Sequence, residues 1–168
     1  MIKIIDNFFD KDLLKKIQTH VTTKIYYTPR WLTGTEKTKE NYYGDRFILN
    51  HDPKLKEIFV KQAEEKFSIK INKLDDDSGI DLRNLDRFMP HTDQQAGKLN
   101  IFIMLKGQTA VTNGIVFYTD NNLDMHVGFR ENRAVMFPSL KMHSPHLNEE
   151  PNQKRYTATL FVKDYELK

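Results

Sequence analysis

The stretch from Leu99 to Leu105 constrains the fold more than any other part of the sequence. It is almost wholly apolar, and alternate residues of an extended chain point to opposite faces of a sheet. One face carries Leu99, Ile101, Ile103 and Leu105, and the other carries Phe102 and Met104. A strand that is apolar on both faces is covered on both faces, so we expect it in the middle of a sheet.

Several further short strands are expected after this one. Apolar runs indicate strands over residues 115–118, 125–130, 133–137 and 156–162, and turn signals at 119–122 and 131–132 separate them. Two helices precede this series of strands. The sequence therefore predicts a mainly β fold with flanking helices (α+β), in which helices lie outside a closed or two-sheet β architecture.

Both helices have recognisable starts. Asp10 is placed to cap the first, and Asp52 followed by Pro53 is a typical start for the second. Apolar residues then recur at helical spacing, at 13, 14, 17 and 21 in the first helix and at 55, 58, 59, 63 and 67 in the second. Residues 1–5 and 67–71 read as short strands, and residues 75–79 read as a turn.

The segment from residue 24 to residue 50 has no clean period, but it is rich in aromatic and basic side chains. These are Tyr26, Tyr27, Arg30, Trp31, Tyr42, Tyr43 and Arg46. Two interpretations stay open. The segment forms a lid or substrate wall, since functional residues concentrate on loops held by a rigid scaffold, or it is a long surface connection pinned by its aromatic residues.

Composition narrows the functional classes. The 168 residues suit one domain, and the absence of cysteine excludes disulfides and thiolate metal sites, so any metal must be held by histidine and carboxylate. The 26 Lys and Arg against 23 Asp and Glu are scattered, which does not predict nucleic-acid binding. Lys3 and Asp6 interrupt the N-terminal apolar run, and no later run approaches about 20 residues. We therefore expect no membrane segment and a cytoplasmic location.

One set of polar residues stands out against the predicted strands. His91 and Asp93 lie two apart, so on an extended chain both can reach one ion. A third ligand must come from another strand, and His143 follows an apolar run. Two histidines and one carboxylate on one face of a metal leave positions open for substrate and oxygen, as in non-haem Fe(II) oxygenases. Arg155 and Thr157 also share a face, and a guanidinium beside a hydroxyl suits a bound carboxylate.

Each of these residues also has a purely structural interpretation. His91 could simply follow a proline at a strand edge, and Asp93 could cap the turn through residues 94–97. Arg155 could be an exposed strand residue, as most arginines are. The order of the residues, separated by strand-like runs, favours a common site.

The chain resembles the 2-oxoglutarate- and Fe(II)-dependent oxygenase superfamily and, within it, the prolyl 4-hydroxylase-like branch. The segments that carry the resemblance are residues 90–93, 99–105, 113–117, 137–139 before His143, and 155–161, in the family's order. The resemblance implies a double-stranded β-helix, or jelly roll, as a metal-binding core over residues 80–163. Residues 1–79 would support it with helices and strands, within one domain over residues 1–168.

The resemblance also implies an activity. His91, Asp93 and His143 would hold Fe(II), and Arg155 with Thr157 would bind the far carboxylate of the cosubstrate 2-oxoglutarate. O2 and 2-oxoglutarate would be consumed, succinate and CO2 released, and a substrate C–H bond hydroxylated. The expected substrate is a small molecule or a peptide, with a prolyl or other amino-acid side chain as the default of the branch, although fold does not fix substrate.

Some details depart from the family's pattern. The strand after the His-x-Asp pair lacks a tyrosine that often contacts 2-oxoglutarate, and a Gly-Gly-x-Thr-like turn is reduced to residues 113–116. His146 competes with His143 as the third ligand. The position four residues after Ser139 favours His143, whereas the distance to Arg155 fits His146 better.

Two other classes of function stay open. A cupin-like metalloenzyme could bind Zn or Mn through the same two histidines and aspartate without using 2-oxoglutarate. The chain could also be a non-enzymatic jelly-roll binding module. Cosubstrate dependence separates the first two classes, and metal binding separates both from the third.

Overall fold

The strand predicted to be central is central in the structure. The computed structural model describes residues 1–31, 36–38, 41–83, 89–109, 113–120, 122–146 and 154–168. Within them, β6 (Leu99–Lys106) lies between β9 (Arg133–Pro138) and β11 (Arg155–Leu167), with antiparallel partners on both sides. Every residue from Leu99 to Leu105 is buried except Phe102, which is partly buried. The prediction that β6 is covered on both faces is confirmed.

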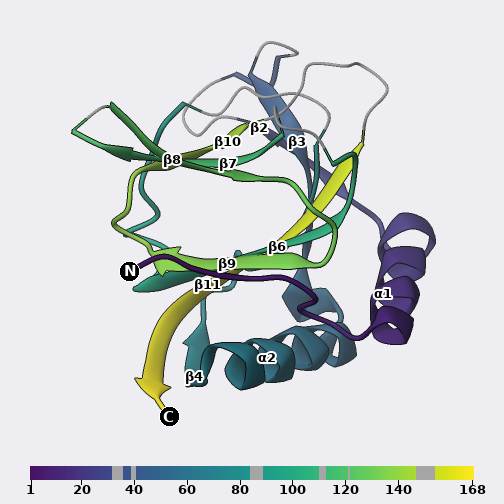
Figure 1. Cartoon of the computed structure of the whole chain (residues 1–168). Coiled ribbons are helices and arrows are strands. Elements are labelled where there is room, and N and C mark those ends of the chain that lie inside the picture. Colours follow the sequence, from purple (N-terminus) through teal and green to yellow (C-terminus); the bar gives the residue numbers. More distant parts are fainter. Residues whose placement is uncertain (32–35, 39–40, 84–88, 110–112, 121, 147–153) are drawn as a thin grey trace.

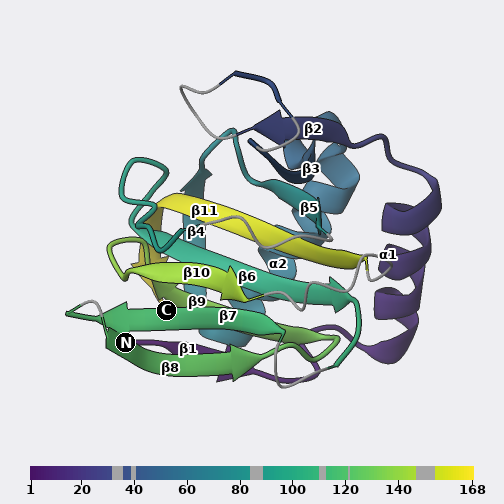
Figure 2. The ribbon, with the colours of Figure 1, turned by 90° about the horizontal axis from the view of Figure 1, so that it is seen from above.

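Two antiparallel sheets make up the described β-structure. The main sheet runs in the order β1 (Lys3–Ile5), β9, β6, β11, β5 (Gly79–Arg83), β3 (Tyr42–Ile48) and β2 (Thr28–Trp31), and β4 (Ile69–Leu74) also pairs with β11. The smaller sheet runs β10 (His143–His146), β7 (Gly114–Thr119) and β8 (Asn122–Gly128). Figure 2 shows the smaller sheet lying over the β1, β9 and β6 part of the main sheet.

A separate apolar cluster fills each side of the main sheet. Between the two sheets lie Met104, Ile115, Phe117, Val127, Phe129, Val135 and Phe137. On the other face, the alternate residues of β6 pack against α1 (Lys11–Thr23) and α2 (Pro53–Phe67) (Figure 1). The prediction of a mainly β fold with its helices packed outside is confirmed, and the two facing sheets have the jelly-roll arrangement.

The helix starts follow the predicted capping. The Asp10 carboxylate accepts a hydrogen bond from the Leu13 amide at 2.8 Å, and the Asp52 carboxylate accepts one from the Leu55 amide at 3.0 Å. Asp52 also lies 2.9 Å from the His20 ring, which joins the two helices. A short 3-10 turn, η1 (Leu49–His51), connects β3 to α2.

Two expectations about local structure need correction. The segment 24–50 is not simply a long surface connection, because β2 and β3 extend the edge of the main sheet there; residues 32–35 and 39–40 lie outside the described part. Phe67 ends α2 and does not begin a strand, since Ser68 takes a left-handed conformation and β4 starts at Ile69. In both places tertiary pairing decided what the sequence pattern left ambiguous.

The predicted support region and core share one sheet. Strands β1 to β4 come from residues 1–79. Three of them pair with strands of the predicted core, β1 with β9, β3 with β5 and β4 with β11, whereas β2 pairs with β3. Neither described helix has the length and apolar character needed to cross a membrane. The cytoplasmic location stays a prediction.

Candidate metal centre

Backbone pairing brings the His-x-Asp segment to the start of β10. The His91 amide donates to the His143 carbonyl at 2.9 Å, and the His143 amide donates to the His91 carbonyl at the same distance. The Asp93 amide donates to the Ser139 carbonyl at 2.9 Å. These bonds fix His91, Asp93 and His143 side by side although some 50 residues of chain separate them.

The three side chains converge on one point. The Asp93 carboxylate lies 3.6 Å from the His91 ring and 3.1 Å from the His143 ring, through Nε2 in each case. One ligand atom from each residue lies within 4.8 Å of the others. Bonds of about 2.1 Å to a common metal place its ligands about 3–4 Å apart, so the separations suit a single ion. His143 is buried, whereas His91 and Asp93 keep part of their surface exposed.

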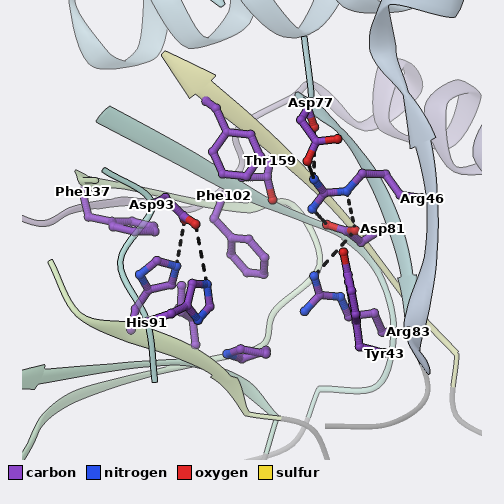
Figure 3. Close-up of a pocket in the computed structure, with 14 residues that line it drawn as sticks. Tyr43, Arg46, Asp77, Asp81, Arg83, His91, Asp93, Phe102, Phe137 and Thr159 are labelled. Carbon is purple, nitrogen blue, oxygen red and sulfur yellow. Dashed lines mark hydrogen bonds and ion pairs between the residues drawn. The ribbon is translucent and has the colours of Figure 1, made fainter. Parts of the chain in front are cut away.

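Backbone carbonyls orient both imidazoles. His91 Nδ1 lies 2.9 Å from the Met89 carbonyl, and His143 Nδ1 lies 2.9 Å from the Lys141 carbonyl. A carbonyl can only accept, so each Nδ1 carries the proton and each Nε2 presents its lone pair to the centre. Metal-ligating histidines are commonly oriented by such a bond from the second ring nitrogen. Figure 3 shows His91 turned toward Asp93 in this way.

Asn100 holds the carboxylate from the other side. Its side-chain amide donates to Asp93 at 2.6 Å from the interior of β6. Burial opposes ionisation of Asp93, but its close contact with the His143 ring and the hydrogen bond from Asn100 outweigh burial and lower its pKa overall. Burial, followed by the nearby His143, lowers the pKa of His91. A neutral imidazole and an ionised carboxylate are the forms that bind a metal.

Asn100 is a residue of the candidate site that the sequence analysis missed. Its signal was a single amide within an otherwise apolar strand, and such a residue needs a polar partner when it is buried. The pattern does not say which partner, because the partner is seven residues away along a chain that turns back.

His91, Asp93 and His143 form a triad. A cavity of about 150 Å³ opens from this triad into the space between the sheets. The triad lies at one end. Phe137 lies beside the triad, with its ring 4.8 Å from the His143 ring. The lining also includes Phe102, Ile115, Pro145, Thr159 and Phe161. Tyr43, Arg46, Asp77, Asp81 and Arg83 line the other end, and Figure 3 shows this polar end facing the triad across Phe102 and Thr159.

The sequence analysis did not identify most of the residues that line the polar end of the cavity. Tyr43 and Arg46 belong to the aromatic and basic segment noted above, but Asp81 and Arg83 carried no signal beyond their place before the His-x-Asp pair. The Arg46 guanidinium donates hydrogen bonds to both carboxylate oxygens of Asp81, at 2.8 and 3.0 Å. Burial opposes ionisation of Asp81, but the charges of Arg46 and then Arg83 outweigh it and keep its pKa below the usual range.

The structure places Arg155 and Thr157 apart from the lining of this cavity. Both are buried, on the face of β11 that points to the smaller sheet. Arg155 Nη1 donates to the Asn113 side chain and to the carbonyls of Gly114 and His146, at 2.9, 3.0 and 3.1 Å. Neither residue is among the described residues that line the cavity.

His143, and not His146, joins His91 and Asp93 in the described part of the chain. Successive residues of β10 point to opposite faces, and His146 comes three residues after His143, so the two rings point to opposite faces. The His146 ring lies 5.2 Å from the His126 ring instead.

Comparison with solved structures finds several proteins of this fold. The non-heme alpha ketoglutarate dependent epimerase SnoN from nogalamycin biosynthesis superposes with a TM-score of 0.67 at 11% identity, covering 96% of this chain and 78% of SnoN. A prolyl hydroxylase from Trichoplax adhaerens, solved with a hypoxia inducible factor peptide, gives 0.63 at 12% identity, with 97% and 83% covered. A 2OG-Fe(II) oxygenase family oxidoreductase from Burkholderia pseudomallei gives 0.62 at 12% identity, with 98% and 84% covered.

Comparison at the level of sequence finds no such relatives. No family model matches the chain, and no curated protein matches it. At identities of 10–12%, the structural likeness shows the fold, on which many activities are carried.

Proposed function

We propose that this protein is a Fe(II)- and 2-oxoglutarate-dependent oxygenase that hydroxylates a small-molecule or peptide substrate. The observation that carries the proposal is the convergence of His91 Nε2, His143 Nε2 and the Asp93 carboxylate at one end of a cavity. Structural neighbours named as alpha ketoglutarate dependent and 2OG-Fe(II) enzymes support it. We propose a prolyl or other amino-acid side chain as the group that is hydroxylated, and the prolyl hydroxylase neighbour supports this choice.

The donor set fits iron. Two imidazole nitrogens and one carboxylate oxygen on one side of an ion are the facial arrangement found in non-haem Fe(II) oxygenases. The carbonyls behind both Nδ1 atoms and the Asn100 amide behind Asp93 supply the outer interactions that such ligands require. His91, Asp93 and His143 are therefore the proposed Fe(II) ligands.

Arg155 and Thr157 are the residues proposed to hold the far carboxylate of 2-oxoglutarate. Arg155 is buried between the sheets, where a guanidinium interacts strongly with a carboxylate. Its Nη1 bonds to Asn113, Gly114 and His146 fix the guanidinium plane. A guanidinium has five N–H donors, so these bonds are compatible with a carboxylate on another edge.

When bound, iron with 2-oxoglutarate and O2 would supply the oxidising chemistry that hydroxylates a C–H bond. The chain itself would position the reactants. The His–Asp–His side chains would leave one face of the ion open toward the cavity, and Phe102, Ile115 and Phe137 would exclude water from that face. Asn100 would keep the Asp93 carboxylate ionised and aimed at the ion.

The test is anaerobic addition of Fe(II) and then 2-oxoglutarate to metal-free protein, read as the weak visible charge-transfer absorption of the chelate. We expect the band in the wild type, its loss in His91→Ala, and a weaker band at a given cosubstrate concentration in Arg155→Ala. His126→Ala removes an imidazole outside the triad and is the matched control, with an unchanged band.

Other outcomes would favour the other classes. Metal binding without the band would favour a cupin-like metalloenzyme, and no metal binding would favour a binding module. A band that survives in His91→Ala would contradict the proposed ligand set.

A further inference from the structure

Two histidines outside the triad leave the same face of the smaller sheet, in which β7 runs between β10 and β8 (Figure 2). His146 of β10 pairs with Gly114 of β7, and His126 of β8 pairs with Val116 of the same strand. Paired residues point to one face, and Gly114 and Val116 are two residues apart, so both histidines share a face. Ile115 points the other way, into the apolar cluster between the sheets. The two histidines therefore lie on the outer face, turned away from the triad.

The two imidazole rings meet across β7. Their centroids are 5.2 Å apart, and their planes are inclined by 56°. The partner of His146 on β7 is Gly114, so β7 places no side chain beside that ring. Two imidazoles bound to one tetrahedral ion, with metal–nitrogen bonds of about 2.0–2.1 Å, have centroids about 5 Å apart. The observed separation suits a single shared ion.

One ring nitrogen of this pair is buried without a partner. Nε2 of His126 makes no hydrogen bond with any group in the described part of the chain. Burial and then the nearby His146 lower the pKa of His126, and a hydrogen bond to the Asn113 backbone opposes them. A backbone group that favours the protonated ring is an acceptor, so Nδ1 carries the proton and Nε2 presents its lone pair. A buried nitrogen of this kind needs an explanation such as a bound water or ion.

The surroundings favour the neutral form of the rings, which is the form that binds a metal. Val116 and Ser144 lie on the same face, between the two histidines along the sheet, and are 3% and 5% exposed. Water is therefore largely excluded from this part of the outer face. His126 and His146 themselves stay partly exposed, so an ion from solution can reach them.

We propose that His126 and His146 together bind one Zn(II) ion, through one ring nitrogen each, with water at the remaining positions. Imidazole suits zinc, and zinc accepts water beside protein ligands in a tetrahedral arrangement. Among the described residues, only the triad gathers three or more candidate ligands, so no third side chain from them joins this pair. The site lies outside the triad and does not depend on the proposed function.

The experiment is equilibrium dialysis of the metal-free, full-length protein against a series of Zn(II) concentrations, followed by metal analysis. The variants are His126→Ala and His146→Ala. They share an intact triad with the wild type, so the difference in bound zinc counts the ion at the pair. His51→Ala removes an exposed histidine elsewhere and is the matched control. Melting temperatures without metal check that each variant is folded, and His126→Gln replaces His126→Ala if the alanine variant unfolds.

We expect the wild type to bind one zinc ion more than either variant of the pair at intermediate zinc concentrations. Each variant should bind that ion about 10–100-fold more weakly or not at all, because loss of a direct ligand costs at least as much as loss of an outer contact. His51→Ala should match the wild type. His143→Ala should lose the zinc of the triad and keep the zinc of the pair.

Other results would overturn the zinc site. Equal zinc binding by the wild type and His126→Ala would do so, and so would a loss in only one of the two variants, because the ion needs both rings. A similar loss in His51→Ala would mean that zinc binds to surface histidines without selection. If all the zinc is lost in His143→Ala, the triad holds the metal and the pair does not.

The same series separates this inference from the proposed function. Zinc at the pair with no Fe(II)–2-oxoglutarate band would leave the zinc site standing and would contradict the proposed function. The band without zinc at the pair would do the reverse.

Discussion

At the scale of single residues, the candidate metal centre depends on groups that hold the ligands as much as on the ligands. The carbonyls of Met89 and Lys141 set the ring orientation of the two histidines. Asn100 positions the carboxylate of Asp93. Contacts of this kind to the second ring nitrogen and to the carboxylate are common around metal ligands in proteins.

The role of Asn100 can be tested directly. Asn100→Ala should weaken metal binding by about 10–100-fold, because outer contacts to metal ligands typically contribute that much. The measurement is competition with a chelator for Mn(II) or Fe(II). Asn72→Ala removes an exposed amide that contacts Asp164 and Glu166, and it should bind metal with unchanged affinity. Equal metal affinity in Asn100→Ala would mean that the bond to Asp93 is incidental.

Asp6 is expected to make stability depend on pH. Hydrogen bonds from Arg133 hold its pKa below the usual value, so the ionised carboxylate stabilises the fold above a pH of about 4, and this stabilisation is lost as the pH falls through the lowered pKa. Asp6→Asn should therefore lower the melting temperature at pH 7, and its difference from the wild type should shrink toward pH 3.

The partner variant supplies the control for that prediction. Arg133→Gln should lower the melting temperature at pH 7 with the same pH trend, and the double variant should lose less than the sum of the two, since they share one interaction. The effects should be small, about 1 kcal/mol or less, because the pair is partly exposed. A difference that stays constant from pH 7 to pH 3 would rule out this account of Asp6.

At the scale of elements, the smaller sheet is what completes the cavity. Its edge strand β10 carries His143, and the pairing of β10 with β7 sets where that histidine points. Gly114 begins β7 with a φ of 148°, a conformation that side chains rarely adopt, and an added Cβ would come within 2.1 Å of the Val127 carbonyl oxygen. The close approach of β7 and β8 thus requires glycine at this position.

Gly114→Ala should destabilise the protein by more than about 2 kcal/mol, since it combines backbone strain with a backbone clash. Urea unfolding measures the loss as a lower midpoint at an unchanged slope. Gly107→Ala is the comparison, because its nearest contact is the Phe129 side chain at 3.0 Å and its φ is ordinary. A loss at Gly114 no larger than the loss at Gly107 would show that β7 can shift.

At the scale of the whole molecule, ligands should stabilise the fold because the centre joins distant segments. Mn(II) with 2-oxoglutarate at about 100 times the dissociation constant should add about 2.7 kcal/mol, which corresponds to roughly 5–10 °C in melting temperature. His143→Ala should abolish most of this shift, whereas His146→Ala, outside the triad, should retain it. A shift retained in His143→Ala would place the metal elsewhere.

Much of the fold was determined by the sequence alone. The two-faced apolar pattern of residues 99–105 required a central strand, and the caps Asp10 and Asp52 required helices at those places. The order of His91, Asp93 and His143 along strand-like segments was enough to suggest one metal centre. These features are local in the chain, or follow from the period of the structure, so the pattern itself carries them.

Only the tertiary structure decided how the ends of the cavity are built. The pairing of β5 with β3 and β11 gathers Arg46, Asp81, Arg83 and Arg155 on one face, and the pairing of residues 91–93 with 139–143 selects His143 over His146. Register between strands far apart in sequence depends on the packing of both sheets, and a shift of one residue turns every side chain to the other face. That is why the sequence could name the proposed ligands of the centre but not the polar end of the cavity that faces them.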